Sequence, residues 1–196
     1  ACVQALLRAK ANTELLNKAG GTALQFAEAQ GQTATAQLIR QHAAPPPPAP
    51  ASPAAPSDAG EAAVSSPAPL PVEVLESVER GELQKVVEWL RKEGPVDALG
   101  SGTTEDGRRM TSTLLHAGAA NGHLEMVREL LERGATVDLQ TNLGNTALMV
   151  AAGRGHLSIL LLLLQHSADP DLQNNYGVTA LMQAADEGHE ACVQAL

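Results

Sequence analysis

The sequence predicts an all-α solenoid made of repeated helix-turn-helix pairs, and three observations support this fold class. Thr113, Thr146 and Thr179 recur at a constant 33-residue step, and each is followed at the same distance by a Gly-His pair. Apolar residues recur at helical spacing after these pairs, as in an amphipathic helix. The chain contains one Phe, one Tyr and one Trp, so its core must be aliphatic. A period of this length indicates helical units that bury their apolar faces against one another.

Charge and composition limit the classes of partner. The formal net charge is −9 over 196 residues, whereas nucleic acids and anionic membranes attract clustered Lys and Arg, so neither is expected as a partner. The longest apolar run, 159–164, is far shorter than the roughly 20 residues of a membrane helix. Only Cys2 and Cys192 are present, and no secretory leader is visible. We therefore expect an intracellular protein, in the cytoplasm, with the nucleus as the alternative.

A proline-rich segment divides the chain. Residues 43–71 hold 10 of the 12 prolines, and such a stretch buries too little apolar surface to offset the entropy lost on ordering it. We expect a disordered, semi-extended linker with polyproline-type geometry. The repeats therefore lie in two stretches of sequence, one before this linker and one after it.

The first helix pair after the linker is expected at 72–99. This segment, VEVLESVERGELQKVVEWLRKEGPVDAL, has the apolar spacing of two helices with Gly81 between them. Its charged outer positions are typical of a solvent-facing cap at the end of a repeat array. Gly81 and Gly122 are farther apart in the sequence than Gly122 and Gly155, which predicts a longer loop over 100–112.

Each following repeat begins with a threonine and turns at a glycine. Thr146 and Thr179 precede short apolar helices and are expected to accept hydrogen bonds from the backbone N–H groups that follow them. Small residues such as Ala151 and Ala152 allow the inner helices to pack closely. The glycine of each Gly-His pair permits the left-handed turn between the two helices of a repeat.

These features resemble the ankyrin-repeat family, whose motif combines a Thr-initiated inner helix, a Gly-His corner and an exit of the LLxxGADxN type. The matching text here includes GNTALMVAAGRGH (144–156) and LLERGATVD (130–138). The resemblance implies helix-turn-helix pairs joined by short β-hairpin finger loops. The family histidine is present at His116 but is replaced by Met149 and Met182 in two repeats, which we expect to soften those repeats without changing the fold.

The hexapeptide ACVQAL occurs at both ends of the chain, at 1–6 and at 191–196. If residue 7 is placed after residue 196, the 33-residue step continues, because Gly31 then follows Gly188 at the same distance as Gly188 follows Gly155. Two interpretations remain open. The chain is a window on a longer protein with tandem arrays, or it is a circular permutant of a single array.

The segments expected from this register are best given in sequence order. Residues 1–42 complete the last repeat and add a closing one, and the linker is long enough for them to fold back in cis onto the 172–196 end. The predicted segments are 1–42 (half-repeat and capping repeat), 43–71 (linker), 72–99 (N-terminal capping helix pair), 100–112 (long finger loop), 113–138 and 139–171 (complete repeats) and 172–196 (truncated repeat).

No catalytic or metal-binding constellation is expected. The periodic histidines would lie on successive helix layers about 10 Å apart, which is too far to share one ion. The glycines of 152–156 lack a P-loop lysine. Asp186 and Glu187 are adjacent carboxylates, which point in different directions on a helix. We therefore expect no enzyme activity, no cofactor and no metal in this chain.

The family resemblance implies a protein-interaction scaffold, because finger loops and the concave face of the inner helices contact protein partners in such proteins. Tyr176 is the one tyrosine and is expected at a fingertip, where an aromatic residue is a plausible binding hot spot. Two alternatives remain: a targeting module of a larger enzyme whose catalytic domain lies outside this chain, and a purely structural spacer. The candidate partner-binding residues are Arg109, Met110, Ala120, Asn121, Asn142, Leu143, Asn145, Gly153, Arg154, Asn175, Tyr176, Val178, Asp186 and Glu187.

Overall fold

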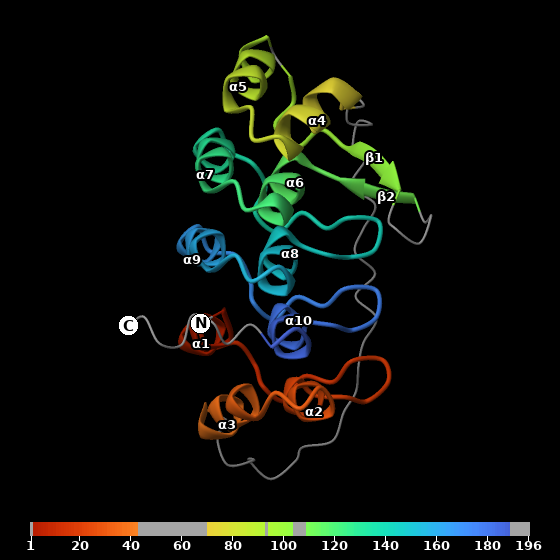
Figure 1. The fold of residues 1–196 in the computed structure, drawn as a ribbon. Coiled ribbons are helices and arrows are strands. Elements are labelled where there is room, and N and C mark those ends of the chain that lie inside the picture. Colours follow the sequence, from red (N-terminus) through yellow and green to blue (C-terminus); the bar gives the residue numbers. More distant parts are fainter. Residues whose placement is uncertain (1, 43–69, 93, 104–108, 189–196) are drawn as a thin grey trace.

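The computed structural model describes residues 2–42, 70–92, 94–103 and 109–188. In these residues the fold is a solenoid of stacked helix pairs, with the inner helices in one column and the outer helices in another (Figure 1). From one end to the other, the pairs are α4 (Val72–Glu79) with α5 (Leu83–Arg91), α6 (Leu114–Asn121) with α7 (Leu124–Glu132), α8 (Ala147–Gly153) with α9 (Leu157–Gln165), α10 (Ala180–Asp186) with α1 (Cys2–Arg8), and α2 (Ala23–Ala29) with α3 (Thr33–His42). The prediction of an all-α solenoid is confirmed.

The order of the layers differs from the order of the sequence. Helix α1 packs against α10, α9 and α3, and α2 packs against α10, so residues 2–42 follow α10 in space (Figure 1). Most of the expected linker, 43–69, lies outside the described residues. The end of the linker was predicted too late in the sequence, because Leu70 is already part of the fold. Leu70 is buried, and its backbone N–H donates to the carbonyl oxygen of Leu99 at 3.0 Å. The described fold after the linker therefore includes Leu70.

Backbone conformation shows that residues 2–42 continue the 33-residue register. Gly134 and Ser167 are one 33-residue step apart, and Lys10 is one further step on if residue 7 is placed after residue 196. All three follow an outer helix and have positive φ, at 84°, 65° and 63°. The corner glycines behave alike, with φ of 73° at Gly155 and 69° at Gly31. Residues 2–42 therefore make the same backbone turns as the repeats that follow the linker.

The core is aliphatic and repeats with the same period. Leu115, Leu148 and Leu181 are equivalent in the 33-residue register and are at most 1% exposed. Alanines line the contacts between neighbouring inner helices, and Ala151 and Ala184 are completely buried. Burial of each leucine side chain is worth about 1.5–3 kcal/mol, and in a stacked array most of that burial depends on the neighbouring layer.

Side-chain caps fix the starts of the inner helices, as the sequence predicts. Thr146 Oγ1 accepts a hydrogen bond from Met149 N, and Thr179 Oγ1 accepts one from Met182 N, both at 3.3 Å. Thr22 forms a reciprocal capping box with Gln25 at the start of α2. These threonines satisfy N–H groups that would otherwise lack partners at a helix start.

The first finger is a regular hairpin, whereas the later described fingers are tighter turns. Strands β1 (Gly100–Thr103) and β2 (Arg109–Ser112) pair antiparallel, with Gly100 opposite Ser112. The extra residues of this finger give it room for a ladder. In the next two fingers the chain closes with a tight turn, in which Thr141 N donates to Asn145 O at 2.9 Å and Asn174 N to Val178 O at 3.0 Å. The finger glycines add a second backbone bond, from Gly144 N to Thr141 O and from Gly177 N to Asn174 O, both at 2.8 Å. No helix in the described segments is long and apolar enough to cross a membrane.

Candidate partner-binding site

Each of the later fingers is shaped by one short polar side chain. Asn174 Oδ1 accepts hydrogen bonds from the backbone N–H groups of Tyr176 at 2.9 Å and Val178 at 3.0 Å. Thr141 has the same role one repeat earlier, where its Oγ1 accepts from Leu143 N and Asn145 N. Such local side-chain bonds fix a turn in place of a strand ladder. The fingertips are therefore held in defined positions.

Neighbouring fingers are also bonded to one another. Asn142 Oδ1 accepts from Thr111 N at 2.9 Å, and Asn175 Nδ2 donates to the carbonyl oxygen of Asn142 at 2.9 Å. Lys18 N donates to the carbonyl oxygen of Tyr176 at 3.0 Å. This bond joins the finger that contains Tyr176, after the linker, to the finger that contains Lys18, before the linker. The fingers form a connected row along one edge of the solenoid (Figure 1), and this row is one wall of the concave face.

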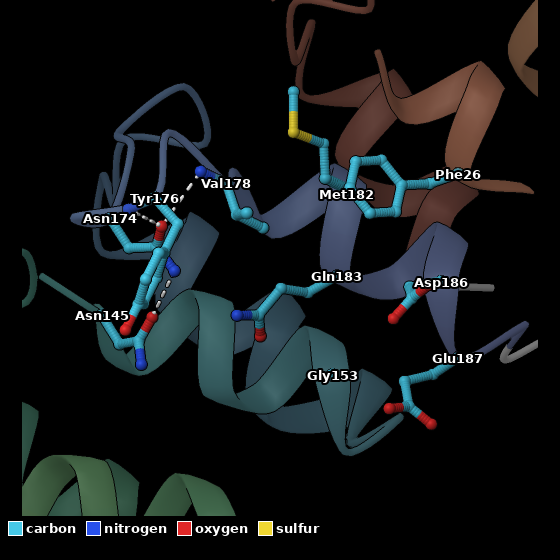
Figure 2. Close-up of a pocket in the computed structure, with 10 residues that line it drawn as sticks. All are labelled: Phe26, Asn145, Gly153, Asn174, Tyr176, Val178, Met182, Gln183, Asp186 and Glu187. Carbon is cyan, nitrogen blue, oxygen red and sulfur yellow. Dashed lines mark hydrogen bonds between the residues drawn. The ribbon is translucent and has the colours of Figure 1, made fainter. Parts of the chain in front are cut away.

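A hollow of about 400 Å³ lies on the concave face, between the fingers and the inner helices α8, α10 and α2. Figure 2 shows Tyr176 and the asparagines at one end, the two carboxylates at the other and Gln183 between them. Side chains from two fingers and three inner helices meet here although they are far apart in sequence. The lining residues are Phe26, Asn145, Gly153, Asn174, Tyr176, Val178, Met182, Gln183, Asp186 and Glu187.

The finger end of this hollow combines an aromatic ring with amides. Tyr176 is 52% exposed. Asn174 Nδ2 donates to Asn145 Oδ1 at 2.9 Å, so the two amides are locked in a fixed orientation across neighbouring repeats. A rigid aromatic residue beside oriented amides can contact an apolar side chain and hydrogen-bond a polypeptide backbone.

The helix end of the hollow is acidic. Asp186 is the last residue of α10, and Glu187 is its C-cap. The C-terminus of a helix carries a partial negative charge, which adds to that of the two carboxylates. Asp186 Oδ1 accepts a hydrogen bond from Gln30 Nε2 at 2.8 Å, which positions one carboxylate without neutralising it. This end of the hollow is therefore suited to a cation.

The middle of the hollow depends on a glycine. A Cβ atom at Gly153 would lie 2.9 Å from Gln183 Oε1, so the absence of a side chain leaves room for the glutamine head group. Gly153 has no positive φ, and its conformation is that of the last turn of α8. A larger side chain at this position would therefore reduce the hollow without a backbone penalty.

A second hollow, of about 170 Å³, lies one repeat closer to α4 and shares Asn145 with the first. Its lining includes Ala120, Asn121 and the buried His116. Asn145 lines both hollows, so they are neighbours along the inner helices, and we refer to the two together as the concave channel.

His116 at the base of this channel is neutral and structural. Its Nδ1 accepts from Thr113 at the start of α6, and its Nε2 lies 3.0 Å from the carbonyl oxygen of Asn145, to which it donates. Burial lowers the pKa of His116, although the contacts with the carbonyl oxygens of Asn145 and Leu139 act in the opposite direction. The side chain therefore joins two repeats and is not a proton donor to a ligand.

The structure brings many of the predicted partner-binding residues together, but not all of them. Six line the first hollow: Asn145, Gly153, Tyr176, Val178, Asp186 and Glu187. Ala120, Asn121 and Asn145 line the second. Asn142 and Asn175 lie in the fingertip row, where their side chains bond to neighbouring fingers.

The other predicted residues have different positions. Leu143 is half-buried in its finger, and Arg154 is the exposed C-cap of α8, outside the linings of both hollows. Arg109 and Met110 belong to β2, but their side chains lie outside the described part of the structure. The hollows, rather than every position that is free of the repeat pattern, therefore define the candidate site.

Four lining residues were not predicted from sequence: Phe26, Asn174, Met182 and Gln183. Asn174 could have been found from the sequence, because a short polar residue recurs at this position. Thr141, Asn174 and Asn17 are equivalent in the 33-residue register, and each precedes a finger glycine. The expected cis docking of residues 1–42 onto the 172–196 end implied that α2 would lie near α10, but not that the Phe26 side chain would reach the hollow.

The recurrent histidines are part of the stacking, not of a metal site. His123 Nε2 lies 3.1 Å from the carbonyl oxygen of Glu79, and His156 Nε2 lies 3.2 Å from that of Ala120, so each imidazole bonds to the preceding layer. His189 and Cys192 lie outside the described residues. Within the described ranges, no group of three or more His, Cys, Asp or Glu side chains is arranged to hold a metal.

A stacked array of helix pairs with a row of fingers and a concave channel defines a repeat solenoid built to present a surface. The family model "Ankyrin repeats (3 copies)" matches residues 115–196. Residues 115–196 of this chain therefore belong to the ankyrin-repeat family. A comparison with curated proteins gives no match. Ankyrin repeats are generally protein–protein interaction modules and are typically non-catalytic.

Proposed function

We propose that this chain is a scaffold that binds an extended segment of a protein partner along its concave channel. The observation that carries the proposal is the convergence of Tyr176, Asn145 and Glu187, from two fingers and the end of α10, on one hollow. The row of bonded fingers and the packed inner helices hold this surface rigid, and a rigid surface loses little entropy on binding.

The chemistry of the hollow favours a particular kind of segment. The apolar lining of Phe26, Val178 and Met182 suits one apolar side chain of the partner, and the amides of Asn145 and Gln183 suit its backbone. The carboxylates of Asp186 and Glu187 suit a Lys or Arg a few residues away. We therefore propose a partner segment with an apolar residue followed or preceded by a basic one, and no catalytic role for the channel.

Selection from a random peptide library displayed on phage tests this function without a known partner. Gly153→Leu fills the hollow, and Gln165→Leu, on an exposed position of α9, is the matched control. We expect peptides enriched on the wild-type protein to bind the control equally and to lose binding to Gly153→Leu. A structural spacer would enrich no peptides, and a site elsewhere would give peptides that bind both variants alike.

A further inference from the structure

One position of the repeat runs along the floor of the concave channel and is acidic at α4 and again at α10. From α4 to α10, the residues two before the corner glycine are Glu79, Ala120, Gly153 and Asp186. The first two line the second hollow, and the last two line the first. Because equivalent positions of stacked repeats face the same way, the two carboxylates lie on one surface with small residues between them.

The floor between these carboxylates is small and apolar. Ala117 and Val150, three residues before Ala120 and Gly153, also line the second hollow. Among the described residues that line the two hollows, the charged ones are Glu79, Asp186 and Glu187. An extended segment in the channel therefore meets negative charge at two places and an uncharged floor between them.

The basic side chains near the channel do not cancel this pattern. Arg80 follows Glu79, but it forms an ion pair with Glu76 at 3.0 Å. Arg154 and Lys18 line neither hollow. The carboxylate of Glu79 thus remains available to a ligand.

Both acidic places lie at the end of a helix that the stack holds still. Glu79 is the last residue of α4, and Asp186 is the last residue of α10. The partial negative charge of a helix C-terminus adds to that of each carboxylate. The carbonyl oxygen of Glu79 lies 3.1 Å from His123 Nε2, which ties this end of α4 to the next layer. The two negative places are therefore a fixed distance apart.

We propose that the partner segment carries two basic residues, one that pairs with Glu79 and one that pairs with Asp186 and Glu187, separated by small or apolar uncharged residues. This inference rests on the proposed function, because it requires a segment bound in the channel. It adds a second basic position to that segment and sets the spacing between the two.

The stack of inner helices determines the spacing. Helix α4 packs against α6, α6 against α8 and α8 against α10 (Figure 1), so three packing steps of about 8–10 Å separate the two acidic places. An extended chain rises about 3.3 Å per residue, so a span of about 24–30 Å corresponds to about seven to nine residues. A segment with closer basic residues leaves one of the acidic places unpaired.

Selection from a random peptide library long enough to span both acidic places tests the spacing. We expect the wild-type protein to enrich peptides with two basic residues about seven to nine positions apart. The Glu79→Gln protein should enrich peptides that keep only the basic residue for the α10 end. Glu73→Gln is the matched control, because it removes the same charge from an exposed position of α4 that lines neither hollow. It should enrich the same peptides as the wild type.

Isothermal titration calorimetry with one enriched peptide tests the pairing directly. At low ionic strength, Glu79→Gln is expected to weaken binding about three- to tenfold, and Glu73→Gln much less. Each basic residue of the peptide is then replaced by Met in turn. One of these two peptides should lose its sensitivity to Glu79→Gln, and the other should retain it.

The outcomes separate this inference from the proposed function. Enriched peptides that lose binding to Gly153→Leu but share only one basic position would overturn the inference and leave the channel as the binding site. Equal losses of affinity in Glu79→Gln and Glu73→Gln would do the same. Failure to enrich any peptide, or peptides that bind Gly153→Leu as well as the wild type, would overturn both.

Discussion

The imidazole of His156 packs against Gly122 of the preceding repeat. Gly122 is left-handed, with φ 76°, and a Cβ atom there would lie 2.8 Å from His156 Cε1. The same relationship joins His123 to Gly81, and Gln32 takes the place of the histidine against Gly188. The Gly-His pair therefore works across layers: the glycine of one repeat accommodates the ring of the next.

Replacement of Gly122 by alanine should separate this contact from backbone strain. Gly122→Ala adds a left-handed non-glycine residue and a clash with the ring, and we expect a loss of about 2–3 kcal/mol in the free energy of unfolding. Gly134→Ala is the control, because its φ is 84° but nothing lies within 4 Å of the added Cβ. Urea denaturation followed by circular dichroism measures both. Equal losses in the two variants would show that the ring contact contributes nothing.

Asn174 should control the shape of the tyrosine finger. Asn174→Ala removes the acceptor for Tyr176 N and Val178 N and the donor to Asn145, and we expect a loss of about 1–3 kcal/mol. Asn175→Ala, at an exposed neighbour with one side-chain bond to Asn142, should cost less. Amide exchange at Tyr176 and Val178 measures the local effect. Unchanged exchange at both amides in Asn174→Ala would contradict this role.

His116 should make stability depend on pH. Because burial holds the pKa of His116 below its ordinary value of 6.5, the unfolded chain binds a proton at a higher pH than the folded one. Stability is therefore full above pH 6.5 and is lost as the pH falls toward the folded pKa. His116→Met copies the methionine at equivalent positions 149 and 182, and it should reduce the difference in the urea midpoint between pH 7.5 and pH 5. The same difference in both proteins would exclude His116 as its source.

The sequence was sufficient for the repeat architecture because stacking imposes residue types directly. A threonine cap, a left-handed corner glycine and the buried leucine at 115, 148 and 181 each leave a periodic mark. The family resemblance implied β-hairpin fingers between the repeats, whereas among the described fingers only the first pairs into strands and the others are tight turns. Whether fingers form ladders depends on loop length, and only the first described finger is long enough.

The candidate site was only partly predictable, because exposure does not show what a side chain contacts. Asn142 and Asn175 are fingertip positions outside the repeat pattern, yet their amides bond to neighbouring fingers. Phe26 joins the hollow through the contact of α2 with α10, which places the start of the chain beside its other end. Sequence register predicts layers, whereas a concave site also depends on how side chains meet between layers.

Tyr176 should be the main apolar anchor for a bound peptide. Tyr176→Ala is expected to weaken binding of a library-selected peptide about tenfold, or about 1.4 kcal/mol. Tyr176→Phe keeps the ring and should weaken it much less. Isothermal titration calorimetry measures the affinities. Wild-type affinity in Tyr176→Ala would remove the fingertip from the site.

The acidic end of the hollow should make binding depend on salt. Asp186→Asn with Glu187→Gln removes both charges at the end of α10, and we expect severalfold weaker binding of a basic peptide at low ionic strength. The effect should shrink at 0.5 M salt because the charges are partly exposed and screened. Glu125→Gln with Glu132→Gln, at two exposed positions of the outer helix α7, removes the same number of charges and controls for net charge. Equal losses in both variants would indicate a general charge effect instead of a site.

The most direct measurement is a map of amide chemical-shift changes in the isotope-labelled full chain on titration with a library-selected peptide. The concave-channel account predicts the largest shifts at Asn145, Tyr176, Val178, Gln183 and Glu187, with saturation at one common affinity. Shifts confined to the outer helices α7 and α9, with no change at these five residues, would contradict it.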